Sequence, residues 1–149
     1  MGEVMIRKME LDDIADVYTV DSASFPVPWT KEIFYQEIAL NSHAYYYVLL
    51  LDEHIVGYVG MWIVEDDAQI TNIAILPSFR GLKLGEKLFR FSIQMAMYHG
   101  AERLSLEVRE SNIVAQNMYR KFGLVPGGIR KKYYTDNKED AIVMWVTLT

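Results

Sequence analysis

The most constraining feature of this chain is segment 69–89, where an alternating apolar strand runs through Pro77 into a turn containing Arg and Gly, and the turn opens a helix. Backbone N–H groups in the first turn of a helix lack intrahelical partners and carry partial positive charge, so they can bind a phosphate or pyrophosphate. Arg80, Lys83 and Lys87 add positive charge to the same turns. The segment therefore predicts a site for a phosphorylated cofactor.

Two common phosphate-binding motifs do not fit this turn. No Gly-Lys-Ser/Thr sequence follows it, so it is not the Walker A loop of nucleotide triphosphatases. Gly81 and Gly85 also lack the three-glycine spacing of a dinucleotide-binding turn. A turn with two glycines between a strand and a helix is equally typical of a plain surface connection, so the turn by itself leaves both interpretations open.

The composition limits the class of protein. A chain of 149 residues, 51% hydrophobic and 23% charged, is typical of a globular domain with a real core, and we expect one domain over residues 1–149. The net charge of −5 argues against nucleic acid as a direct ligand and is compatible with a basic peptide substrate. The chain has no Cys, hence no thiolate nucleophile, and its three His residues are scattered, so we expect no metal.

The N-terminal residues and the apolar runs indicate where the protein works. The chain does not start with the basic and then apolar pattern of a secretory signal. Its longest apolar run, 44–51, has eight residues, far fewer than a membrane span needs. We expect a cytoplasmic protein with no membrane partner, and favour a monomer.

Hydrophobic periodicity and turn residues predict the order of the elements. A strand is followed by two helices, the first begun by Asp12 or Asp13 and the second capped by Thr30. Three strands, a long helix, a strand, a short helix capped by Ser111 or Asn112, and two strands complete the chain. The strands are expected at 4–9, 44–51, 55–64, 68–76, 104–109 and 141–148, with one more before the polar loop 135–140, and the long helix at 82–98. This order predicts an α/β fold with one mixed sheet of about seven strands and about four helices.

Glu107 is the first candidate for chemistry, because it lies on the polar face of an alternating strand between Leu106 and Val108. An unpaired carboxylate near the middle of a core strand is costly to bury, so we expect the protein to use it. It could form a salt bridge with Arg109 or lie at an exposed edge. It could equally be a general base that takes a proton from an amine, directly or through water.

Further candidates lie in the C-terminal third. Tyr119 follows Asn112 by seven residues, or two helical turns, so the two share a helix face. Taken alone, Tyr119 is typical of a core aromatic residue and Asn112 of a helix cap. Tyr133 and Tyr134 follow a basic run and are by themselves typical of strand residues.

Together these residues resemble the GNAT superfamily of acetyl-CoA-dependent acetyltransferases over essentially the whole chain. The superfamily's cofactor motif, Arg/Gln-x-x-Gly-x-Gly/Ala, corresponds to residues 80–85. Within the superfamily, the chain is most similar to the bacterial alanine N-acetyltransferases of small-subunit ribosomal protein eighteen. That closer likeness is carried by the segments 72–75, 106–112, 119–123, 130–134 and 139–144.

The resemblance implies a single-domain GNAT fold and acetyl-CoA as cosubstrate. The pyrophosphate would lie on the turn 80–86, and the pantetheine arm would pair with 73–75 like an additional strand. The residues implied for cofactor binding are Ile73, Ala74, Ile75, Arg80, Gly81, Leu82, Lys83, Leu84, Gly85, Glu86 and Asn112.

The resemblance also implies roles in the reaction. Glu107 would be the base, and Tyr119 the acid that protonates the leaving CoA thiolate. Attack on the thioester would be direct, because the chain has no Cys to carry an acyl group. The residues expected to line a peptide groove are Phe25, Trp29, Tyr133 and Tyr134.

The implied activity is acetyl transfer to the N-terminal α-amine of a protein, and most specifically to the N-terminal alanine of small-subunit ribosomal protein eighteen. Two alternatives stay open. One is an acetyltransferase of small amines such as a polyamine or an aminoglycoside. The other is a CoA-binding module without catalytic activity.

One residue departs from the cofactor motif, because Lys83 stands where the motif usually has its first Gly. If the position requires a positive φ, Lys would be strained there. If the position is already helical, its N–H stays usable and its ammonium could contact a phosphate. Since Gly81 and Gly85 are both present, we expect the helical conformation.

Overall fold

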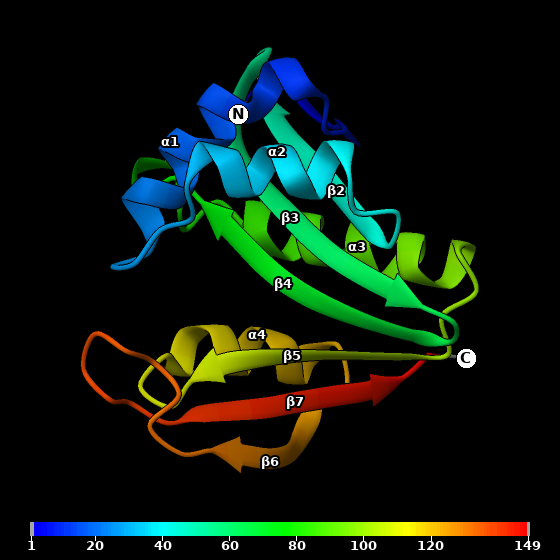
Figure 1. Cartoon of the computed structure of the whole chain (residues 1–149), viewed down its shortest axis with the longest axis vertical. Coiled ribbons are helices and arrows are strands. Elements are labelled where there is room, and N and C mark those ends of the chain that lie inside the picture. The colour runs from blue at the N-terminus through cyan, green and yellow to red at the C-terminus, as the bar shows by residue number, and fades with distance from the viewer. Residues whose placement is uncertain (1, 149) are drawn as a thin grey trace.

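The computed structural model describes residues 2–148; Met1 and Thr149, the outer bounds of the expected domain, lie outside the described residues. Within them the chain forms one seven-stranded sheet with four α-helices, which confirms the predicted α/β class (Figure 1). The strands are β1 (Val4–Lys8), β2 (Ala44–Leu51), β3 (His54–Val64), β4 (Asp67–Ile75), β5 (Arg103–Arg109), β6 (Val125–Arg130) and β7 (Ala141–Thr147). The helices are α1 (Ile14–Ser24), α2 (Lys31–Ala39), α3 (Leu84–Tyr98) and α4 (Ile113–Lys121), with short 3-10 turns at Leu11–Asp13 and Pro77–Phe79.

The middle of the sheet is split. Its strand order is β1-β2-β3-β4-β5-β7-β6, and β4 and β5 form its parallel pair. Their register covers only 67–69 against 103–105. In Figure 1 the two strands run together at one end and separate toward the other. Residues 70–75 of β4 therefore have one edge that pairs with β3 and another that β5 leaves open.

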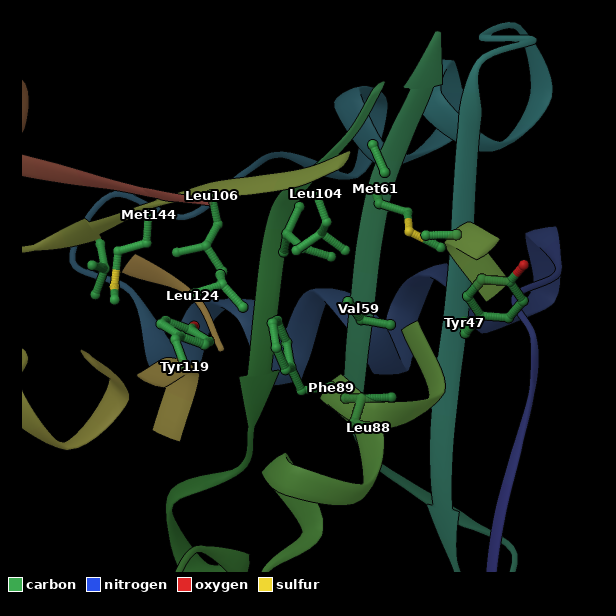
Figure 2. Close-up of a cluster of buried hydrophobic side chains, with 14 of the residues drawn as sticks. Tyr47, Val59, Met61, Leu88, Phe89, Leu104, Leu106, Tyr119, Leu124 and Met144 are labelled. Carbon is green, nitrogen blue, oxygen red and sulfur yellow. The ribbon is translucent and has the colours of Figure 1, made fainter. Parts of the chain in front are cut away.

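The two faces of the sheet pack against different helices. Because side chains alternate along a strand, Tyr58 of β3 points toward α1 and α2, while its neighbour Val59 points toward α3. Figure 2 shows the second of these cores, where Leu106 lies near Tyr119 of α4. Since Leu106 and Val108 belong to this core, Glu107 between them faces the α1 and α2 side.

The helix ends follow the capping signals in the sequence. The Thr30 side chain accepts a hydrogen bond from the Ile33 N–H at 3.2 Å, which confirms the predicted cap of α2. The Asn112 side chain likewise accepts from the Ala115 N–H at 3.2 Å. Helix α1 ends at Ser24, and Phe25 after it is extended. The reason is Pro26, which disfavours helical backbone at the preceding residue.

Candidate active site

A cavity of about 510 Å³ lies where β4 and β5 separate. Its walls come from α1 and the segment after it, from β3, from the two diverging strands, from α4 with its cap, and from the loop before β7. It brings together the predicted residues Phe25, Trp29, Ile73, Glu107, Asn112, Tyr119, Tyr133 and Tyr134. Residues far apart in the sequence thus surround one space, into which a peptide end and a cofactor arm could enter.

Glu107 is largely buried, its side chain 15% exposed, and one of its oxygens is free. Oε1 lies 3.5 Å from Nη1 of Arg130, whereas Oε2 is buried without a hydrogen-bond partner among the described residues. The salt bridge with Arg109 considered from the sequence does not form. Arg109 instead reaches Asp136, with Nη2 3.0 Å from Oδ1. Glu107 therefore lines the cavity, and one of its carboxylate oxygens is buried without a hydrogen-bond partner among the described residues.

Arg109 organises the loop that carries Tyr133 and Tyr134. Its guanidinium stacks over the Tyr134 ring, 4.0 Å from the centroid, and lies 3.4 Å from Glu139. Glu139 also accepts the backbone N–H of Ser111. Hydrogen bonding by the Ser111 side chain, and secondly by this N–H, lowers the pKa of Glu139 to about 2. Sequence reasoning did not assign Arg109 to the site, although its spacing of two from Glu107 places both on one strand face.

Tyr119 is a core residue that also borders the cavity. It is 6% exposed, and its ring lies 5.0 Å from that of Phe89 (Figure 2). Burial, and secondarily Tyr134, raise the pKa of Tyr119 well above the usual range of a phenol. Burial also raises the pKa of Tyr134, to about 12. Both hydroxyls therefore stay protonated near neutral pH and can donate hydrogen bonds.

Asp21 is a site residue that sequence reasoning missed. It is 1% exposed, lines the cavity from α1, and accepts the Trp29 backbone N–H at 2.7 Å and the Tyr58 hydroxyl. Burial raises its pKa. Nothing in the spacing of the first helix marked this Asp, because its partners lie on another element and in the following loop.

The turn before α3 has two consecutive left-handed bends. Gly81 has φ of 81° and Lys83 has φ of 62°. The helical conformation expected for Lys83 is therefore wrong: Lys83 is the N-cap of α3, and the helix begins at Leu84. The chain must reverse direction between the 3-10 turn and the helix, and this reversal needs positive φ where the family motif usually has Gly.

The geometry of this turn fits a phosphate. Lys87 N–H donates to the Lys83 carbonyl at 3.2 Å, so the N–H groups of 84–86 lie in the first turn of α3, before any helical partner. A Cβ atom added at Gly81 would meet nothing within 4 Å, and one added at Gly85 would first meet Met118 at 3.8 Å. The turn is thus open to a ligand. It lies outside the cavity, and the open edge of 70–75 runs between the two.

The sequence and fold place this arrangement among known proteins. Residues 14–124 match the model of the acetyltransferase (GNAT) family.

The chain belongs to this family. GNAT enzymes use acetyl-CoA.

Relatives match the chain over nearly its whole length. The ribosomal protein bS18-alanine N-acetyltransferase of Haemophilus influenzae is 34% identical over 145 residues, 94% of this chain and 96% of that protein. A protein of Bacillus subtilis (strain 168), provisionally given the same name, is 57% identical over 143 residues, 96% of this chain and 95% of its own. The crystal structure of the Escherichia coli ribosomal-protein-S18-alanine N-acetyltransferase is 28% identical, with a TM-score of 0.91, covering 99% of this chain and 95% of that one.

Two further features are absent from residues 2–148. No group of three or more His, Asp or Glu side chains there could hold a metal ion. None of the helices in that part of the chain is both long and apolar enough to cross a membrane.

Proposed function

We propose that this GNAT protein transfers the acetyl group of acetyl-CoA to the N-terminal α-amine of a protein, and that its acceptor is the N-terminal alanine of ribosomal protein bS18. The observation that carries the chemistry is the free Oε2 of Glu107, a buried carboxylate oxygen beside the cavity. The named relatives, which align over more than nine tenths of the chain, support the choice of acceptor.

Acetyl-CoA supplies an acetyl group already activated as a thioester. Glu107 takes one proton from the acceptor ammonium, and the neutral nitrogen then attacks the acetyl carbonyl. As the carbon–sulfur bond breaks, the nitrogen releases its second proton to solvent and the amide forms. We propose that Tyr119 acts at the sulfur as a hydrogen-bond donor, and not as the acid that the resemblance implies. A thiol has a pKa of about 8.5, and burial holds the pKa of Tyr119 far above that. We therefore propose that Tyr119 donates a hydrogen bond to the developing thiolate. The thiolate takes its proton from solvent.

The cofactor would be held by backbone and charge. The N–H groups of 84–86 and the terminal nitrogens of Arg80 would bind the pyrophosphate. Arg80 Nε donates to the Ile75 carbonyl at 3.0 Å, which anchors the guanidinium beside the turn. The arm would extend along the open edge of 73–75, and Asn112 would contact it near the cavity.

The acceptor groove would be formed by Phe25 and Trp29 on one side, and by Tyr133 and Tyr134 on the other. All four line the cavity and lie in loops. If these side chains close over a bound peptide, the groove favours a chain end over a residue whose backbone continues in both directions. The proposal disfavours a CoA-binding module without activity, because such a module would have no use for the free Glu107 oxygen.

The remaining parts of the proposal follow from the acceptor. A ribosomal protein substrate is made in the cytoplasm, so we propose that the enzyme works there. We further propose that residues 1–149 act as one domain and as a monomer. The reaction as written needs no metal, no membrane and no direct contact with nucleic acid.

The decisive experiment is mass spectrometry of an Ala-initiated peptide that also carries an internal Lys. An α-amine has a pKa near 8 and a Lys amine one near 10.4, so at neutral pH the α-amine is several hundredfold more often neutral. We expect acetylation almost entirely at the N-terminus, with spermidine and acceptor-free reactions as controls. Acetyl groups mainly on Lys, or faster turnover with spermidine, would contradict the proposal.

A further inference from the structure

Two buried side-chain atoms within residues 2–148 have no hydrogen-bond partner: Oδ1 of Asn72 and Oε2 of Glu107. Both residues line the cavity, Asn72 from β4 and Glu107 from β5, on opposite sides of the split. A buried oxygen without a donor loses its hydrogen bonds to water and gains none in return, so two such atoms beside one cavity are uncommon unless a ligand uses them. Two acceptors beside one cavity call for a ligand that brings several donors.

The two residues lie on the same face of the sheet. Ala74 packs in the core beneath α1 and α2, and Asn72, two residues earlier on β4, points the same way. Glu107 also faces this side, because its neighbours Leu106 and Val108 pack in the opposite core. The split in the sheet thus separates two oxygens that face a common space.

A hydrogen bond and the electrostatics of Tyr58 indicate how the Asn72 amide is oriented. The Tyr58 hydroxyl donates a hydrogen bond to Oδ1 of Asp21, so the Tyr58 oxygen is left as an acceptor. Burial raises the pKa of Tyr58 and the Asn72 side chain opposes that rise, which is the effect of a donor directed at the Tyr58 oxygen. Only the amide nitrogen can be that donor, so the carbonyl oxygen is the atom left without a partner. Asp21 is itself held by the Trp29 N–H at 2.7 Å.

We propose that Asn72 Oδ1 binds the acceptor's α-ammonium together with Glu107 Oε2, each accepting one N–H of the same nitrogen. This inference rests on the proposed function. Glu107 removes the proton that it accepts. Asn72 cannot, so its hydrogen bond persists and holds the nitrogen with its lone pair free for attack. Tyr58 and Asp21 are positioning residues, because they act on the amine only through Asn72.

The test compares binding of two peptides by calorimetry in the presence of CoA, so that no reaction occurs. One peptide begins with Ala and has a free amine; its desamino analogue has a propionyl group in place of that Ala. Asn72→Leu keeps the approximate shape but removes the acceptor. We expect it to weaken binding of the free-amine peptide at least about tenfold and to leave binding of the desamino peptide unchanged. Asn72→Asp keeps an acceptor oxygen and should preserve the preference for the free amine.

A second pair of variants separates positioning from general stability. Tyr58→Phe removes the oxygen that orients the Asn72 amide, and we expect a several-fold loss of the free-amine preference. Tyr46→Phe is the matched control, because Tyr46 is also buried and donates to a buried carboxylate, Glu37, at 2.9 Å. This control should keep the preference.

The outcomes distinguish the two levels of the proposal. Suppose that the wild-type protein acetylates the peptide and that folded Asn72→Leu still prefers the free-amine peptide. This result overturns the role of Asn72 and leaves the proposed function in place. If circular dichroism shows that Asn72→Leu does not fold, the second pair of variants decides. Equal preferences for the free-amine peptide in Tyr58→Phe and Tyr46→Phe would then overturn the role of Asn72. A wild-type protein that acetylates no peptide N-terminus overturns the proposed function, and this inference with it.

Discussion

Lys83 has a backbone conformation that suits Gly better than Lys. Its φ of 62° places it in the left-handed region, which costs a residue with a Cβ atom about 1–2 kcal/mol. The turn imposes this conformation, because α3 must begin at Leu84 with its N–H groups directed outward. The exposed Lys side chain is thus present at some cost in stability and adds a charge beside the proposed phosphate site.

We predict that Lys83→Gly raises the free energy of unfolding by about 1 kcal/mol, because the strain exceeds the added entropy of the unfolded chain. The matched control is Lys87→Gly in the same helix, also exposed, which should lower stability by about 1 kcal/mol. Urea unfolding without cofactor measures both. Equal losses in the two variants would contradict a strained Lys83.

The proposed role of Glu107 as general base can be tested by replacing one oxygen of its carboxylate. Glu107→Gln keeps the shape but cannot take the proton, and loss of a positioned base typically lowers the rate about 10²–10⁴-fold. The deficit should shrink as the pH rises above about 8, where the acceptor amine loses its proton unaided. Initial rates from pH 6 to 10 measure this. A deficit that does not change with pH would indicate a structural role for Glu107.

Among the elements, the loop between β6 and β7 depends most on charge. Glu139 joins it to the start of α4 through Ser111 and to β5 through Arg109. The pKa of Glu139 is about 2, against an ordinary 4.5, so the folded state stabilises the ionised form of this carboxyl group. The contribution of Glu139 to stability is therefore complete above about pH 4.5 and is lost as the pH falls toward 2.

We predict that Glu139→Gln is less stable than the wild-type protein at pH 7. The difference in stability should narrow below about pH 4.5 and vanish near pH 2. Because the loop carries Tyr133 and Tyr134, the variant should also raise the KM for the peptide more than that for acetyl-CoA. Thermal unfolding across this pH range measures the first effect. Glu53→Gln, in an exposed hairpin turn, is the control. A gap that stays constant with pH would exclude this ionic contribution.

At the scale of the whole molecule, only a few paired residues join the two halves of the split sheet. Between β4 and β5 the register covers only 67–69 against 103–105. A cofactor arm lying along 70–75 would supply backbone partners that β5 does not. Ligand binding should therefore strengthen the centre of the sheet as well as occupy the turn.

We predict that saturating CoA slows hydrogen exchange of backbone amides in 70–75, while those in 67–69 are already slow. At a hundredfold excess over Kd, the stability should rise by about 2.7 kcal/mol. Gly85→Asp puts a negative charge beside the proposed phosphate site and should weaken binding at least about tenfold. In that variant CoA at the same concentration should protect 70–75 less. Unchanged affinity in a folded Gly85→Asp protein would place the phosphate elsewhere.

Local patterns in the sequence predicted much of this protein. Alternation and 3.6-residue periodicity gave the order of the strands and helices, because burial of one face acts along each element separately. Thr30 and Asn112 were recognisable as helix caps, since a cap bonds to an N–H three residues away. The isolated Glu107 in an apolar strand was recognisable as a candidate, because its burial needs a reason.

Only the tertiary structure decided how those elements meet. The early end of the β4 and β5 pairing, the turn of Arg109 away from Glu107, and the left-handed Lys83 each depend on contacts or chain reversals that span several elements. The hydrogen bond between Asp21 and Tyr58, and the effect of Asn72 on the pKa of Tyr58, link α1, β3 and β4, so no spacing within one segment predicts them. Short-range patterns determine which residues are buried, whereas partners across a sheet are set by the packing of the whole chain.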